Sequence, residues 1–311
     1  MFGHASGKGW AVKLRRVRTD RGLETQCLRD GQWLPYPEPP GGETFGREWQ
    51  LAAADRHLAA SDLLLPFQPV SFRDFMLYEQ HTIDASRGLL RRFHPGQYRV
   101  AAAVERVTGR PFPLFRPKPL FHRKPMYYLG NHLTFVPSGT PIACPPYSSA
   151  LDYELEIGFV LAEPLLDATP AEAASAIGAF VLLNDFSARD VQRAEMASGF
   201  GPQKSKHFAS SMSATAVTAD EVLPRIDALT GSVAINGTVV SAVSSAGMRW
   251  SLGEVLAHAS SGEQLLPGEL FGTGTLPGGS GMETGHWLRP GDTLTLTLDG
   301  VGEVEHTVVG R

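Results

Sequence analysis

The sequence of 311 residues has little cysteine and no long apolar run. Its two cysteines, Cys27 and Cys144, lie far apart and fit no zinc or redox spacing. We therefore expect a reducing environment, for which the cytoplasm is the default. No apolar run approaches the length of a membrane span, and the first ten residues lack the apolar core of a signal peptide. The sequence thus predicts a cytoplasmic protein without a membrane partner.

The chain also lacks an excess of charge of either sign. Its 28 basic and 32 acidic residues give a formal net charge of −4, which leaves no electrostatic footprint for nucleic acid. Glycine (33) and proline (23) are abundant, together more than a sixth of the chain. This abundance favours a turn-rich, mainly β architecture over a helix bundle. We expect an α+β protein with a few short helices.

Alternating residues mark one strand that carries acids. Between Leu151 and Phe159, apolar residues alternate with Asp152, Glu154 and Glu156, which is the period of a β-strand. A second apolar segment, residues 179–183, reads as a buried strand and ends at Asp185. If these strands bring Glu154, Glu156 and Asp185 together, the three carboxylates suit Mg²⁺ or Ca²⁺. The alternative is a solvated strand face with an ordinary loop aspartate.

Turn and cap signals divide the rest of the chain. We interpret residues 1–66 as a small β-rich domain, with a strand at 10–19, a hairpin at 23–34 and a helix at 48–60, and residues 67–311 as a second domain. Hairpins are expected at Asn236-Gly237 and at Asp299-Gly300. Capping boxes at Thr169–Glu172 and at Ser251–Glu254 predict two short helices.

A histidine follows an aspartate by two helical turns. Asp74 and His81 are seven residues apart, so on a helix they would share one face, and Asp84 could orient His81. His81 is the general-base candidate because an imidazole titrates near neutrality. A solvated amphipathic helix is the alternative. Residues 93–125 show little periodicity and carry seven basic residues, which indicates either a lid or a passive insertion.

Five further polar residues could serve a site. If the chain turns helical after Asp185, then Arg189 and Gln192 share its face; Arg189 can bind a carboxylate and Gln192 can donate to an oxyanion. Lys206 follows a glycine-rich loop that lacks the phosphate-binding P-loop spacing, so it is either functional or solvated. A second glycine loop, residues 271–285, brings Thr275 and Glu283 into an ordered but irregular segment.

Taken together, these motifs resemble the fumarylacetoacetate hydrolase family over roughly residues 70–308. The resemblance rests on DYELEIGFVL, NDFSARDVQ, the spacing of Gly201, Pro202 and Lys206, SGTPI at 138–142, and the GTGT…GSGME loop, in the family's order. It implies a mixed β-sandwich roll, a homodimer, and a divalent cation, Mg²⁺ or Ca²⁺, with Mn²⁺ as a third option. The spacing from Asp74-Phe75 to His81 resembles the fumarylacetoacetase branch.

The resemblance also implies roles for individual residues. The metal ligands would be Asp74, Glu154, Glu156 and Asp185. The catalytic groups would be His81 as base, Glu283 as its orienting partner, and Lys206, Arg189 and Gln192 on the oxyanion and substrate side. The substrate contacts would include Tyr128, Thr275, and Arg91 or Arg92, which lie one and two residues from the position of the family's lid arginine. Met76 and Met196 stand where the family has substrate tyrosines, so the substrate differs from the family pattern.

The activity implied is metal-dependent hydrolysis of a carbon–carbon bond in a 1,3-diketone-like acid of the fumarylacetoacetate or acylpyruvate type, as in aromatic catabolism. A decarboxylase, hydratase or isomerase of a 2-oxo acid is the first alternative, since the same enolate chemistry serves all of them. A catalytically silent metal-binding protein is the second alternative.

Overall fold

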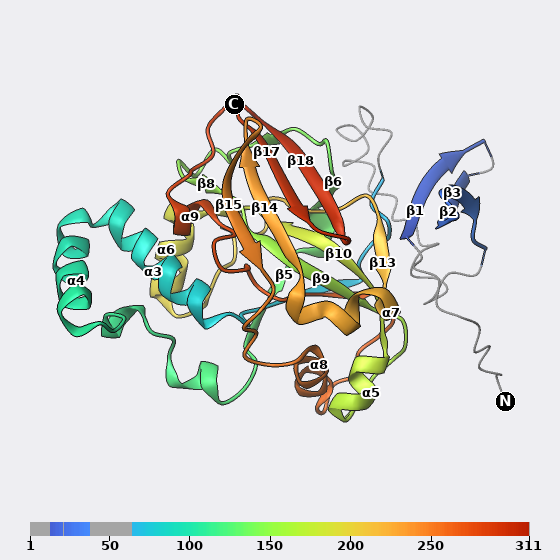
Figure 1. The fold of residues 1–311 in the computed structure, drawn as a ribbon, viewed down its shortest axis with the longest axis horizontal. Helices are drawn as coiled ribbons and strands as arrows, with labels where there is room; N and C mark the ends of the chain where they lie inside the picture. The colour runs from blue at the N-terminus through green and yellow to red at the C-terminus, as the bar shows by residue number, and fades with distance from the viewer. Residues whose placement is uncertain (1–12, 21, 38–63, 311) are drawn as a thin grey trace.

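Short apolar and alternating segments form two β-sheets in the computed structural model, which describes residues 13–20, 22–37 and 64–310 (Figure 1). The larger sheet has the strand order β3-β2-β1-β13-β10-β9-β16-β4-β5, and β12 joins β10 to β6. Its strands are β1 (Lys13–Thr19), β2 (Gly22–Arg29), β3 (Gln32–Pro35), β4 (Ser71–Phe75), β5 (Tyr127–Gly130), β6 (Phe135–Pro137), β9 (Leu155–Leu161), β10 (Ile177–Asp185), β12 (Ser210–Met212), β13 (Ala216–Thr218) and β16 (Glu269–Gly272).

The second sheet is built from the predicted C-terminal hairpins. It has the order β15-β14-β17-β18-β7, and a two-stranded pair, β8-β11, lies apart from both sheets. The strands are β7 (Ile142–Ala143), β8 (Leu151–Asp152), β11 (Ser187–Ala188), β14 (Thr230–Ile235), β15 (Thr238–Ser244), β17 (Thr293–Leu298) and β18 (Gly302–Val309). Asn236, with φ +52°, and Gly237 form the turn between β14 and β15, as expected. The mainly β, α+β expectation is confirmed.

The helices are short and lie around the sheets (Figure 1). They are α3 (Glu79–Phe93), α4 (Pro95–Thr108), α5 (Pro170–Ser175), α6 (Arg189–Ser198), α7 (Ala219–Val222), α8 (Leu252–Ser260) and α9 (Gly281–Thr284), with 3₁₀ turns η1 (Pro113–Phe115), η2 (Pro119–His122), η3 (His132–Thr134) and η4 (Leu223–Ala228). Both predicted capping boxes, at Thr169 and Ser251, are present. Within the described ranges, no helix has the length and apolar character needed to cross a bilayer.

Two local expectations were wrong. Residues 93–125 are not irregular throughout, because 95–108 form α4, which an ion pair of Arg87 with Glu105 holds against α3. Asp74 and His81 do not share a helix face: Asp74 belongs to β4, and α3 begins only at Glu79. Asp74 is taken up by the pairing of β4 with β16, so its helical spacing from His81 has no structural counterpart. Asp185 ends strand β10, as the apolar segment before it had predicted, and the helix that carries Arg189 and Gln192, α6, begins only at Arg189.

The N-terminal hairpin joins the larger sheet. Its turn at Asp30-Gly31 connects β2 and β3 as predicted, and β1 pairs with β13 through Lys13↔Val217 and Leu14↔Ala216. The expected helix at 48–60 and the start of the first strand, residues 10–12, lie outside the described residues. The division of the chain at residue 66 stays a prediction.

The core explains why acids can lie inside this protein. Strands β9 and β10 are buried along their whole length, with Phe159 and Phe180 fully enclosed between the layers. The alternative of a solvated face for the acidic strand is therefore wrong, because every residue from Leu151 to Leu161 is buried. Carboxylates enclosed in this way need partners, since burial disfavours an uncompensated charge.

Candidate active site

A cluster of buried carboxylates forms where three strands of the larger sheet end. Asp74 is the penultimate residue of β4, Glu154 precedes β9 and Asp185 ends β10; one ligand oxygen from each lies within 4.8 Å of the others. Antiparallel pairing places Glu156 opposite Leu183, two residues before Asp185. Gly272 of β16 lies between β4 and β9, where a Cβ would come 2.5 Å from Asp74 Oδ1 and 2.8 Å from Glu156 Oε2. The sheet and this glycine therefore bring the predicted metal ligands together.

The donor set fits a hard divalent cation. Asp74 Oδ1 and both oxygens of Glu156 are buried and have no hydrogen-bond partner among the residues that the structure describes. Burial, with Asp185 nearby, raises the pKa of Asp74 to about 7. Burial and then Asp74 raise the pKa of Glu156 well above its usual range. Buried carboxylate oxygens without a hydrogen-bond partner are the ligands that Mg²⁺, Ca²⁺ or Mn²⁺ would bind. Asp74, Glu154 and Asp185, with Glu156 beside them, would therefore hold the ion.

Two buried cations neutralise part of the cluster. Lys206 forms ion pairs with Glu154 and with Asp185, the latter at 2.7 Å from Nζ to Oδ2. Arg189 Nη2 lies 2.8 Å from Glu154 Oε1. Burial by itself would raise the pKa of Glu154, but Lys206 and then Arg189 outweigh it and hold that pKa well below its usual range. Burial likewise opposes the charge of Lys206, yet Asp185 and Glu154 raise its pKa. Lys206 is therefore not a solvated loop lysine.

The polar residues expected on the substrate side surround this cluster. Arg189 Nη1 donates to Gln192 Oε1 at 2.8 Å, so Gln192 lies beside the arginine. The Tyr128 hydroxyl donates to Asp185 Oδ2, and Ser210 Oγ donates to Asp185 Oδ1 at 2.9 Å. Ser210 was not predicted as a site residue. It reaches Asp185 because the two residues lie opposite each other in the β10–β12 pair.

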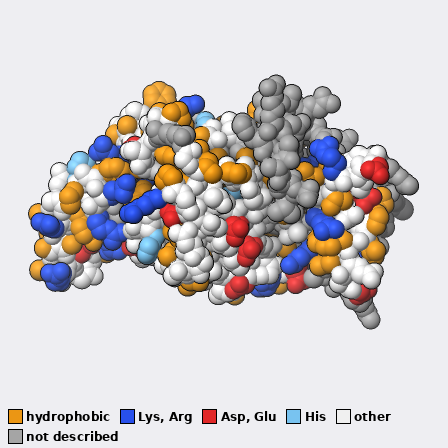
Figure 2. Space-filling model, turned by 90° about the horizontal axis from the view of Figure 1, so that it is seen from above, with side chains coloured by type: hydrophobic (Ala, Val, Ile, Leu, Met, Phe, Trp, Pro, Cys, Tyr) orange, Lys and Arg blue, Asp and Glu red, His pale blue; other side chains and the backbone are white. Residues whose placement is uncertain are grey.

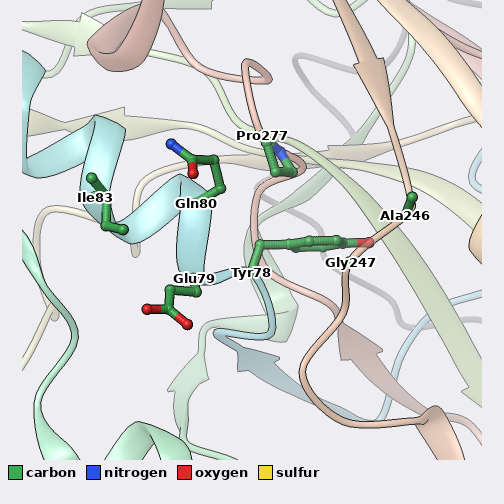
Figure 3. A pocket seen from close by; sticks show the side chains of 7 residues that line it. All are labelled: Tyr78, Glu79, Gln80, Ile83, Ala246, Gly247 and Pro277. Atoms are coloured by element: carbon green, nitrogen blue, oxygen red, sulfur yellow. The ribbon is translucent and has the colours of Figure 1, made fainter. Parts of the chain in front are cut away.

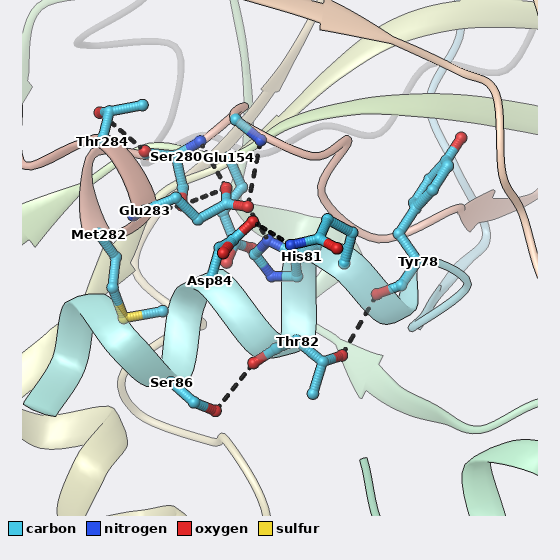
Figure 4. Close-up of polar contacts among 12 residues, drawn as sticks. Tyr78, His81, Thr82, Asp84, Ser86, Glu154, Ser280, Met282, Glu283 and Thr284 are labelled. Atoms are coloured by element: carbon cyan, nitrogen blue, oxygen red, sulfur yellow. Dashed lines mark hydrogen bonds and ion pairs between the residues drawn. The ribbon is translucent and has the colours of Figure 1, made fainter. Parts of the chain in front are cut away.

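An imidazole–carboxylate pair lies beside the acids (Figure 4). His81, in the first turn of α3, has its Nδ1 3.2 Å from Glu283 Oε1, and both side chains are nearly enclosed. Burial would lower the pKa of His81, but Glu283 outweighs it and raises that pKa above its usual value. Glu283 lies on α9 and not in an irregular loop. Because Glu283 engages Nδ1, Nε2 is the nitrogen left to exchange a proton with a substrate or water.

Asp84 does not orient His81. Its Oδ1 pairs with Arg87 Nη1 at 2.7 Å, and its Oδ2 accepts from Gln80. Asp84 is therefore engaged by residues of α3 itself. Glu283, 202 positions after His81, lies against the imidazole, which is the role that the helical spacing had suggested for Asp84.

Asp152 is a residue of the site that its sequence pattern had not marked as functional. This carboxylate is fully buried, and its Oδ2 accepts from Arg189 Nε at 2.7 Å and from the backbone of Met282 at 3.1 Å. Asp152 thus joins the arginine beside the metal cluster to α9, which carries Glu283. The available signal was its place two residues before Glu154 in the alternating strand.

The remaining predicted contacts lie farther out. Arg91 Nη2 donates to the Glu283 carbonyl at 3.1 Å, and the Arg92 guanidinium lies 4.1 Å from the centre of the Trp287 ring. Both arginines are exposed, whereas Thr275 is buried beside Gly279. Their substrate roles stay predictions.

A separate surface cavity of about 320 Å³ lies beside the start of α3 (Figure 3). It is lined by Tyr78, Glu79, Gln80, Ile83, Ala246, Gly247 and Pro277. At about 100° of rotation per residue, Glu79 and Ile83 lie roughly half a turn around the helix from His81. This cavity therefore opens on the other face of α3 and is distinct from the acid cluster.

Comparison with known proteins identifies the family. Residues 98–309 match the model of the fumarylacetoacetate (FAA) hydrolase C-terminal family. The chain belongs to the FAA hydrolase family. The match covers Glu154, Glu156, Asp185, Lys206 and Glu283, whereas Asp74 and His81 precede it. Members of this family are enzymes and generally use a divalent cation, in agreement with the buried acids.

Relatives within the FAA hydrolase family catalyse different reactions. The mitochondrial oxaloacetate tautomerase of Mus musculus is 28% identical over 174 residues, which cover 56% of this chain and 76% of that protein. The 2,4-didehydro-3-deoxy-L-rhamnonate hydrolase of a Sphingomonas strain is 29% identical over 52% of this chain and 56% of its own. The solved structure of 5-carboxymethyl-2-hydroxymuconate delta-isomerase from Mycobacterium smegmatis, 22% identical, covers 96% of this chain and 100% of its own, with a TM-score of 0.67. That structure supports the fold alone.

Proposed function

We propose that this FAA hydrolase family member is a metal-dependent hydrolase that cleaves a carbon–carbon bond in a 1,3-diketone-like acid. The observation that carries the proposal is the enclosed His81–Glu283 pair, 3.2 Å between Nδ1 and Oε1, beside a cluster of carboxylates suited to a cation. A base next to a cation site is what hydrolysis of an unactivated carbonyl needs, because free water is a weak nucleophile at neutral pH. When bound, the cation would supply Lewis-acid stabilisation of the substrate's dicarbonyl oxygens.

The chain's own residues divide the remaining work. His81 takes a proton from water through Nε2, while Glu283 stabilises the imidazolium that forms. Water adds to the carbonyl carbon. Lys206, Arg189 and Gln192 stabilise the negative charge that develops on the carbonyl oxygen. The carbon–carbon bond then breaks, its electron pair leaves with the dicarbonyl fragment, and the proton held by His81 returns to that carbon.

A basic stretch of the chain that follows His81 supports an anionic substrate. Between residues 85 and 125 the chain has ten basic residues and only Glu105 as an acid. Figure 2 shows Lys and Arg side chains interleaved with hydrophobic ones at the end of the molecule that α3 and α4 form. The basic residues are Arg87, Arg91, Arg92, Arg99, Arg106, Arg110, Arg116, Lys118, Arg123 and Lys124. A positive field of this kind raises the encounter rate of small carboxylates.

The second candidate is a tautomerase or isomerase of a 2-oxo acid. The similarity to oxaloacetate tautomerases favours it, and His81 would then take a proton from carbon instead of from water. Decarboxylation or hydration of a 2-oxo acid uses the same enolate chemistry and stays with this candidate. All of these reactions need the same cation site, so the fate of the substrate distinguishes them.

A substrate panel with full product analysis tests the proposal. Acylpyruvates, fumarylacetoacetate-type acids and oxaloacetate are incubated with and without Mg²⁺ in D₂O. Hydrolysis gives two acids and loss of diketone absorbance; tautomerisation gives deuterium exchange without fragments; decarboxylation gives CO₂. His81→Ala with full metal occupancy should lower hydrolysis about 10²–10⁴-fold. Near-normal turnover by that variant would reject His81 as the base, and metal binding without any turnover would favour a non-catalytic protein.

We also propose that the protein is a homodimer, from the family resemblance, and that it is cytoplasmic, from its two widely spaced cysteines. Light scattering coupled to size-exclusion chromatography tests the dimer, and a mass of one chain, 33.6 kDa, would reject it.

A further inference from the structure

Among the helices of residues 64–310, three begin with the same capping box, and only one of these three faces the site. Thr169–Glu172, Ser251–Glu254 and Ser280–Glu283 each pair a hydroxyl with the backbone three residues on, while the glutamate returns to the cap. The first two boxes are exposed. In the third, Ser280 is fully buried, and the Glu283 side chain is 3% exposed.

The Glu283 carboxylate is fixed by contacts on both oxygens (Figure 4). Oε2 accepts from Ser280 Oγ at 2.8 Å and from the Ser280 backbone at 3.1 Å. Oε1 accepts from the Gly278 backbone at 3.1 Å and lies 3.2 Å from His81 Nδ1. A glutamate has three side-chain torsions and a broad last one, so these donors select the single orientation that reaches the imidazole.

The same cap is attached to the metal side of the site. Ser280 forms an isolated β-bridge with Glu154, and Leu155 donates its backbone N–H to the Gly279 carbonyl at 2.9 Å. The serine therefore lies between the strand that presents Glu154 and the short helix that presents Glu283. A shift of the cap would change the distance between the acid cluster and the base.

We propose that Ser280 is a positioning residue for the His81–Glu283 pair, and that this capping box serves catalysis as well as helix α9. The inference rests on the proposed acid–base role of His81. The Ser280 hydroxyl touches no reacting atom; it holds the glutamate rotamer that orients the imidazole. A displacement of a catalytic group by about 1 Å is enough to cost a large factor in rate, even where the fold is intact.

The experiment compares matched cap variants on the best substrate of the panel. Ser280→Ala and Ser251→Ala each remove one capping hydroxyl, and each should lower the Tm by about 2–4 °C. Only Ser280→Ala should lower kcat, by roughly 10-fold or more, with KM and Mg²⁺ affinity within about 2-fold of wild type. Ser280→Thr keeps the hydroxyl and should restore kcat. Equal kcat in Ser280→Ala and Ser251→Ala would overturn the inference.

Two additions keep the outcome interpretable. Ser280→Gly lacks the hydroxyl but retains a favourable cap residue, so it replaces Ser280→Ala if the alanine variant does not fold. The ¹⁵N NMR signal of the His81 Nδ1–H can be measured without substrate. It should be unchanged in Ser251→Ala and Ser280→Thr but shifted or broadened in Ser280→Ala. An unchanged signal in Ser280→Ala would contradict the inference. Glu283→Gln and His81→Ala separate the two proposals. If they retain turnover, the acid–base role fails; if they lose turnover while Ser280→Ala does not, only the inference fails.

Discussion

Lys206 Nζ lies 2.7 Å from Asp185 Oδ2 and also pairs with Glu154, so a fixed positive charge sits inside the carboxylate cluster. The lysine and a divalent cation would share the same oxygens. At separations of 4–5 Å, two such charges repel by several kcal/mol even at an effective dielectric constant of about 20. The cluster therefore balances one cation against another.

Replacing this lysine should strengthen metal binding while it weakens catalysis. For Lys206→Met we expect Mg²⁺ affinity to rise roughly tenfold or more, because the competing charge is gone. Turnover should fall at saturating metal, because the group that favours the oxyanion is lost. Calorimetric titration and steady-state kinetics measure the two effects. Lys204→Met, at an exposed position on the same loop, is the control. Weaker metal binding in Lys206→Met would contradict the prediction.

The effect of the metal on stability should grow with pH. Burial raises the pKa of Asp74 to about 7 and raises the pKa of Glu156 as well, so ionising these groups opposes folding. The contribution of Asp74 to stability is present below its unfolded pKa near 4 and is lost as pH rises through about 7, and the contribution of Glu156 is lost in the same direction. A cation removes that cost. We expect the Tm difference with and without Mg²⁺ to widen between pH 5 and pH 8, in scanning calorimetry with a chelator as reference. The widening should shrink in Glu156→Gln, and a constant difference across this range would be inconsistent with the assigned ligands.

Asp152→Asn should lower both stability and turnover. The carboxylate holds Arg189 at 2.7 Å and the Met282 backbone at 3.1 Å, and loss of its charge leaves a buried arginine with less compensation. We expect a loss of several kcal/mol and a fall in turnover of about 10–100-fold. Denaturant unfolding and kinetics with saturating metal measure these. Asp190→Asn, which removes the charge of the neighbouring acid that binds Ser148 and Ser149, serves as the control and should keep near-normal turnover.

His306 should make the protein sensitive to acid. It is fully buried between the Thr140 carbonyl, at 2.8 Å from Nδ1, and Ser211 Oγ, at 2.9 Å from Nε2, and burial lowers its pKa to about 4. A depressed histidine pKa contributes stability that is fully present above about 6.5 and is lost as pH falls toward 4, by up to about 3 kcal/mol. Unfolding free energies of wild type and His306→Asn, measured from pH 7.5 to 4.5, should converge on acidification. Parallel curves would show that another group is responsible.

The segment from 94 to 125 should be more ordered when the protein has bound both a substrate analogue and Mg²⁺. Helix α4 has exposed valines at 100, 104 and 107, and the Arg87–Glu105 pair is its ionic link to α3. Few buried contacts permit local opening. Hydrogen exchange should slow there when a diketo-acid analogue and Mg²⁺ are both bound, while the β14–β15 hairpin stays unchanged. Equal exchange in both states would indicate a passive insertion.

The local chemistry of the sequence was sufficient for the turns, the caps and the acids. Asn236-Gly237 adopts the backbone of a tight hairpin, and Thr169 and Ser251 cap their helices as the motif requires. The meeting of Glu154 with Asp185 was also predictable, because an alternating strand and a buried apolar strand each have a recognisable sequence pattern. The turns, the caps and the pattern of each strand depend on residues within a few positions of one another, where propensity and hydrogen bonding act directly.

The tertiary structure alone decided which distant groups meet. Helical spacing linked Asp74 with His81 and His81 with Asp84, but pairing of β4 with β16 places Asp74 on a strand, and Glu283 from α9 reaches the imidazole. The burial that raises the pKa of Asp74, and the contact of Asp152 with both Arg189 and Met282, likewise arise only in the packed sheets. Contacts between residues more than a hundred positions apart leave no periodic trace in one sequence, because their energy depends on sheet order and enclosure and not on local spacing.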